Sequence, residues 1–163
     1  MRFNPIDTYR VEAEELLAAI EQSAMALESG QHTAETIHEL FRAFHTIKGS
    51  GAMCGLDAIA GFTHHVESLL DKAREGTVAA SPALAALVLK ARDHICALLH
   101  GDDASAAARQ RVGDGLIEAI ERFAIAGPAV TPAPPGAGRT WKIEFRPGLE
   151  LFERGTDPLA LLS

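Results

Sequence analysis

The first 125 residues repeat one pattern, in which apolar residues recur every three or four positions and Gly, Pro or capping residues interrupt it at helix-length intervals. This spacing is typical of amphipathic helices that bury one face. It predicts five helices, over about residues 7–29, 33–55, 56–75, 81–100 and 105–125. Short connections make consecutive helices antiparallel neighbours. We therefore expect an all-α, up-and-down antiparallel four-helix bundle with a fifth, C-terminal helix.

Start and stop signals support these ranges. Ser81 suits an N-cap and Pro82 the first helical position, while Gly30 and Gly76 stand where helices should end. Four residues are also expected in the core: Val11, Met25, Met53 and Val112. Cys54 and Cys96 belong to no CxxC or Cys/His cluster, so we expect two buried thiols.

The chain is predicted to have three parts. The helical bundle occupies residues 1–125, and a linker rich in Pro, Gly and Ala follows over 126–139. In 140–163, apolar Trp141, Ile143 and Phe145 alternate with polar residues, as in a strand. That segment is too short to form a core alone, so it is interpreted as the start of an incomplete small α+β domain.

Charge and hydropathy exclude several classes of function. Asp and Glu outnumber Lys and Arg by 22 to 15, and no basic cluster with interleaved aromatics occurs, so nucleic acid is not an expected partner. No uncharged run in the helical region is long enough to span a bilayer. Acidic residues precede any apolar run at the N-terminus, unlike a secretory signal, which predicts a cytoplasmic location.

The residues best suited to a chemical role lie late in the second predicted helix, in FRAFHTIKGSGAMCG. At 100° per residue His45 falls on the border of the apolar stripe, so its ring is expected to be partly exposed. Lys48 and Gly49 follow one turn later on the same side. Gly49 and Gly51 each cost about 1 kcal/mol relative to Ala in a helix, which indicates a compensating close approach, by a neighbouring helix or by a docked partner.

The third predicted helix carries matching polar residues. His64 and Glu67 are three positions apart and flank its apolar stripe. If the two helices form an antiparallel hairpin around Gly55, Glu67 comes within reach of His45. A carboxylate bound to one imidazole nitrogen fixes the tautomer and leaves the other nitrogen as an exposed nucleophile. This is the geometry that a phosphoryl-accepting histidine requires.

These residues resemble the histidine phosphotransfer (HPt) domain in the form found at the N-terminus of CheA chemotaxis histidine kinases. The match is most specific at His45-Thr-Ile-Lys48-Gly49 and extends through about residues 41–76. A looser similarity covers all five predicted helices. The resemblance implies that His45 is the phosphorylated residue and that Glu67 orients its imidazole.

The resemblance also implies roles for the residues around this pair. Lys48 would supply counter-charge to the phosphoryl group, and His64 would support the polar site. Gly49 and Ser50 are the expected partner-binding residues, although Ser50 stands where many relatives have a second glycine.

The expected cofactors and partners follow from the same resemblance. Phosphate would come from ATP through a histidine kinase catalytic domain and pass to an aspartate of a CheY/CheB-like response regulator receiver. The sequence contains no GxxxxGK[ST] loop and no kinase-type GxGxxG, so this chain is expected to bind no cofactor itself. ATP and Mg²⁺ would belong to the kinase domain, and Mg²⁺ also to the receiver. The chain would be a phosphotransfer substrate within a CheA-type kinase.

Two alternatives compete with this interpretation. Helical bundles also host di-metal sites built from paired Glu-x-x-His motifs, but only Glu35-Thr-Ile-His38 fits, so no metal ligands are predicted. The other alternative is an inert helical scaffold with a surface histidine at position 45. Five further histidines form no constellation and are expected to be solvated or helix-terminal: His32, His38, His65, His94 and His100.

Overall fold

The computed structural model describes residues 4–101 and 105–126, and this part of the chain consists of five α-helices with short connections. They are α1 (Pro5–Glu28), α2 (Ala34–Met53), α3 (Asp57–Arg74), α4 (Pro82–His100) and α5 (Ala106–Ala126). The predicted all-α class is confirmed, and each predicted helix end lies within two residues of the observed one. Apart from Ala126, which ends α5, the predicted linker and strand lie outside the described residues, so the proposed domain boundaries stay predictions.

The helix ends follow from the local sequence. Ser81 caps α4, because its Oγ accepts a hydrogen bond from the Leu84 backbone N–H at 3.3 Å, and Pro82 is the first helical residue. Three helices are followed by glycines with positive φ angles, namely Gly30 (72°), Gly55 (74°) and Gly76 (78°). This left-handed conformation suits glycine, and it turns the chain back after each helix.

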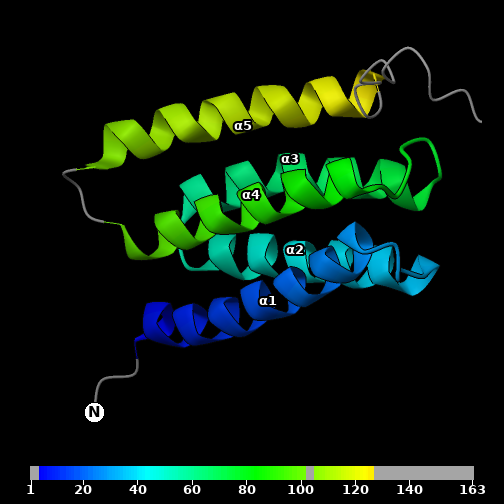
Figure 1. Cartoon of the computed structure of the whole chain (residues 1–163). Helices are drawn as coiled ribbons and strands as arrows, with labels where there is room; N and C mark the ends of the chain where they lie inside the picture. The colour runs from blue at the N-terminus through cyan, green and yellow to red at the C-terminus, as the bar shows by residue number, and fades with distance from the viewer. Residues whose placement is uncertain (1–3, 102–104, 127–163) are drawn as a thin grey trace, which may run out of the picture. The chain divides into compact units, whose positions relative to one another are not determined.

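The first four helices form a closed ring, since α1 packs on α2, α2 on α3, α3 on α4 and α4 on α1. Successive helices run in opposite directions, and α5 lies outside the ring along α3 and α4 (Figure 1). This is the predicted bundle with a fifth helix. None of the described helices combines the length and apolar content needed to cross a bilayer.

The core lies inside the ring. Its largest fully buried side chains come from α1 to α4 and include Ile20, Leu27, Leu40, Phe44, Ile47, Leu69, Leu70, Leu84 and Ile95. Burial of each such side chain stabilises the fold by about 1.5–3 kcal/mol. From α5 only Gly113, Ile120 and Phe123 are buried, so α5 is a covering layer rather than a full member of the bundle.

Several expected core residues are in fact exposed. The prediction is wrong for Val11 (59% exposed), Met25 (57%), Met53 (90%) and Val112 (56%). Val11 lies two positions from both Tyr9 and Ala13, which are buried, and 200° of helical rotation turns it to the opposite side. Val112 belongs to α5, which is covered on one face only. Cys54 and Cys96 are free thiols that are only partly buried.

The expectation that His94 is solvated or helix-terminal is wrong. This residue is buried at the junction of α3, α4 and α5. Its ring meets the Phe62 ring edge-to-face at a centroid distance of 4.5 Å. A Cβ atom at Gly113 would lie only 2.7 Å from its Nε2, so this glycine makes room for the imidazole. Burial lowers the pKa of His94, the Arg109 charge lowers it further, and Asp114 opposes the shift.

Candidate functional site

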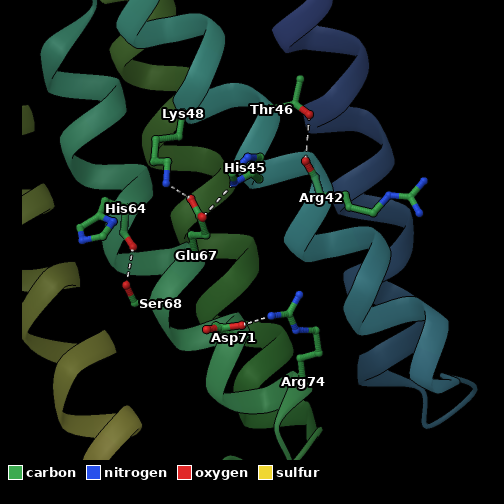
Figure 2. Close-up of polar contacts among 9 residues, drawn as sticks. All are labelled: Arg42, His45, Thr46, Lys48, His64, Glu67, Ser68, Asp71 and Arg74. Carbon is green, nitrogen blue, oxygen red and sulfur yellow. Dashed lines mark hydrogen bonds and ion pairs between the residues drawn. The ribbon is translucent and has the colours of Figure 1, made fainter.

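The α2–α3 hairpin brings His45 and Glu67 together. The His45 Nδ1 lies 2.9 Å from the Glu67 Oε1, although the two residues are 22 positions apart (Figure 2). The turn after α2, with its positive-φ Gly55, reverses the chain and sets this register. This contact is the one that the helical spacing predicts.

Lys48 contacts the other oxygen of the same carboxylate. Its Nζ lies 2.5 Å from the Glu67 Oε2, so Glu67 stands between the imidazole and the ammonium group (Figure 2). The Glu67 side chain is 13% exposed and the Lys48 side chain 29%, whereas His45 is 62% exposed. The carboxylate is thus the sheltered centre of the cluster, and the imidazole is its outward part.

The charge state of Glu67 determines which His45 nitrogen carries a proton. Partial burial raises the pKa of the Glu67 carboxyl, but the hydrogen bonds and charges of Lys48 and His45 more than offset this, and the pKa lies below its usual value. An ionised carboxylate can only accept hydrogen bonds. The His45 Nδ1 must therefore be the donor, and in the neutral ring Nε2 keeps its lone pair.

The space beyond His45 is open. A Cβ atom at Gly49 would meet no described atom within 4 Å, whereas one at Gly51 would lie 3.0 Å from the Tyr9 Oη. Of the two explanations for these helix glycines, packing inside the bundle applies to Gly51. It does not apply to Gly49, which lies exposed one turn after His45.

The remaining expected site residues lie near the cluster. The Ser50 Oγ donates to the Thr46 carbonyl of its own helix at 2.6 Å. His64 is exposed on α3, one turn before Glu67, and its ring points away from His45 (Figure 2). The interactions described for His64 are the Ser68 Oγ bonded to its carbonyl at 2.9 Å and the neighbouring His65 ring. Its supporting role and the partner-binding role of Ser50 stay predictions.

Sequence reasoning missed one residue beside the imidazole, Phe41, and a second, Arg74, that contacts Phe41. The Phe41 ring stacks on the His45 ring, and the Arg74 guanidinium lies over the Phe41 ring. The i,i+4 spacing of Phe41 and His45 is visible in the sequence, but an apolar residue at position 41 also fits the apolar stripe of the helix, which gives no sign of a contact with His45. Nothing in the sequence pairs Arg74 with Phe41.

The metal alternative gains no geometric support. Glu35 is exposed and lies 4.0 Å from Arg42, and His38 is exposed as well. In the part of the chain that the structure describes, no group of three or more His, Cys, Asp or Glu side chains is arranged to hold a metal ion.

Known proteins resemble this chain in sequence and in fold. It is 32% identical to a chemotaxis protein CheA of Cereibacter sphaeroides over 90% of this chain and 25% of that protein. It is 31% identical to a CheA of Treponema pallidum over 93% of this chain and 20% of that protein. The chain therefore spans a quarter or less of the length of these relatives.

A solved structure shares the bundle. The phosphorylated P1 domain of CheA3, in complex with CheY6 from R. sphaeroides, superimposes with a TM-score of 0.60 at 28% identity, covering 72% of this chain and 96% of that one. Residues 6–101, which include α1 from its second residue, all of α2 to α4 and the His45–Glu67–Lys48 cluster, match the Hpt domain family. The chain belongs to the Hpt domain family.

Proposed function

We propose that this chain is a phosphotransfer domain of a chemotaxis signalling system, in which His45 receives a phosphoryl group and passes it to a response regulator. The observation that carries this proposal is the hydrogen bond between the His45 Nδ1 and the sheltered Glu67, together with the 62% exposure of the imidazole. One nitrogen is fixed and the other is accessible. The similarity to CheA proteins and to a phosphorylated P1 domain agrees with this arrangement.

In the first step, the lone pair of the His45 Nε2 attacks the γ-phosphorus of ATP held by a separate histidine kinase domain. The N–P bond forms as the bond from phosphorus to the ADP oxygen breaks. The ring becomes positively charged, and the Glu67 carboxylate at Nδ1 stabilises that charge. ATP and Mg²⁺ belong to the kinase domain, because phosphoryl transfer requires a metal and charge neutralisation that this cluster does not provide alone.

In the second step, an aspartate of a CheY/CheB-like receiver attacks the phosphorus and the N–P bond breaks. The receiver would supply Mg²⁺, and it must approach closely over an unobstructed surface. Exposed Gly49, one turn from His45, offers such a surface, and Ser50 lies beside it. Lys48 is paired with Glu67 in the unphosphorylated chain, and its role as counter-charge to the phosphoryl group belongs to the proposal. We also propose that the chain acts in the cytoplasm.

The test is phosphorylation by a CheA kinase core with ATP and Mg²⁺. The wild-type chain should acquire acid-labile label that a CheY-like receiver removes. His45→Gln should acquire none, while His38→Gln, which alters an exposed histidine of the same helix, should be labelled like the wild type. Label that persists in His45→Gln would show that another residue accepts the phosphate.

A further inference from the structure

His45 has a neighbour that the proposed chemistry does not use. Phe41 stands one turn earlier on α2, and its ring is nearly parallel to the imidazole, with centroids 5.9 Å apart and 17° between the planes. Residues four apart share a helix face, and offset parallel rings at this separation attract each other. The imidazole is therefore contacted at Nδ1 by Glu67 and beside its ring by Phe41.

Phe41 is itself held by the end of α3. The guanidinium carbon of Arg74 lies 4.5 Å from the centroid of the Phe41 ring, within the range of a cation–π interaction. The Arg74 Nη2 donates to the Asp71 Oδ1 on the same helix at 2.5 Å (Figure 2). Asp71, Arg74 and Phe41 thus form a second bridge from α3 to His45, beside the one made by Glu67.

A single hydrogen bond does not fix the orientation of a ring. The χ2 torsion of histidine has a broad energy profile, so the imidazole can tilt while Nδ1 stays within reach of Glu67. Attack on phosphorus requires the Nε2 lone pair to point along the line of the breaking bond, and a small misplacement of reacting atoms lowers the rate. A ring stacked beside the imidazole limits this tilt, which the hydrogen bond alone does not restrict.

We propose that Phe41, held by Arg74, is a positioning residue for His45: it sets the tilt of the imidazole so that Nε2 is presented for phosphoryl transfer. This inference rests on the proposed function of His45. Phe41 acts through the ring it contacts and does not touch the phosphoryl group.

The first test needs no phosphorylation. In NMR spectra of the free protein, the carbon-bound imidazole protons of His45 should carry a ring-current shift from Phe41, assigned by comparison with His45→Gln. Phe41→Leu keeps an apolar side chain at this position and should abolish the shift. Arg74→Gln should reduce it, and Arg74→Lys, which keeps a cation over the ring, should restore it.

The second test is single-turnover phosphorylation by a CheA kinase core at saturating kinase. Phe41→Leu should lower the rate constant about 2- to 10-fold, in proportion to the modest attraction between stacked rings. The kinase concentration that gives half the maximal rate should not change. Arg74→Gln should show a smaller loss that Arg74→Lys restores. Arg42→Gln is the matched control. It removes an equal charge from the residue that follows Phe41, whose side chain is 75% exposed, and it should behave as wild type.

Three outcomes overturn the inference. Unchanged imidazole shifts in Phe41→Leu would show that the ring contact is absent in solution. An unchanged phosphorylation rate constant, combined with slower transfer to a receiver, would make Phe41 a docking residue. Equal losses in Arg74→Gln and Arg42→Gln would assign the Arg74 effect to net charge. If instead the wild-type chain is never labelled, the proposed function fails, while the NMR shifts still report on the contact.

Discussion

His45 and His94 show two ways in which one bundle uses an imidazole. His45 projects from α2 with 62% of its side chain exposed, and charged Glu67 and Lys48 lie beside it. His94 is buried where α3, α4 and α5 meet, against the Phe62 ring and Gly113. A hydrogen bond fixes the tautomer of the first ring and leaves the ring accessible, whereas the second ring fills space in the interior. Exposure with a fixed tautomer is what the proposed phosphoacceptor role of His45 requires, and the buried His94 lacks that exposure.

The comparison predicts that the Glu67 contact is essential to the exposed site. Glu67→Ala should fold normally but be phosphorylated about 10- to 100-fold more slowly. This factor corresponds to the free energy of one hydrogen bond to a charged group. Glu67→Gln should lose less, because its amide oxygen still accepts from Nδ1. Single-turnover labelling of the three proteins measures this. Equal rates in all three would show that His45 needs no orienting acceptor.

The buried site should respond most strongly to a change in volume. Gly113→Ala places a methyl group 2.7 Å from the His94 Nε2, so α5 or the imidazole must shift. In Gly115→Ala, the matched control on the same helix, the new Cβ meets no described atom within 4 Å. We expect Gly113→Ala to be less stable than Gly115→Ala by about 1–3 kcal/mol in urea unfolding. Equal stabilities would mean that Gly113 does not hold α5 against His94.

A smaller effect concerns pH. The pKa of His94 is lowered from 6.5 by burial and Arg109, so the folded state favours the neutral ring. On acidification the unfolded chain takes up this proton first, so the stability contributed by His94 is present above pH 6.5 and is lost as the pH falls through the lower, folded pKa. Wild type should therefore lose more stability than His94→Gln between about pH 7.5 and about pH 5. Parallel losses in urea unfolding would contradict the burial of a neutral ring.

Sequence reasoning succeeded where periodicity and local signals determine the outcome. Capping by Ser81 and the glycines after α1 and α3 fixed the helix ends, and the hairpin register placed Glu67 at His45. These features depend on near neighbours or on a single reversal of the chain.

It failed where the result depends on which helix faces are covered. Val112 is exposed and His94 is buried because α5 packs on α3 and α4 from outside the ring, and no spacing in the sequence encodes that choice. The Phe41–Arg74 contact was missed for the same reason, since the end of α3 meets α2 only in the assembled bundle.

The smallest predicted effect separates Gly49 from Gly51. In the helix interior Gly49→Ala should raise the stability by up to about 1 kcal/mol, because the described surroundings leave room for the methyl group and alanine favours the helix. Gly51→Ala, its matched control two positions later, should gain less, since the new Cβ lies 3.0 Å from the Tyr9 Oη. Urea unfolding decides. If only Gly49→Ala gains stability, Gly49 lowers the stability of the free chain and no internal packing compensates for the loss. This result would favour a role for Gly49 in receiver docking. A loss of stability in Gly49→Ala would instead assign the glycine to internal packing of α2.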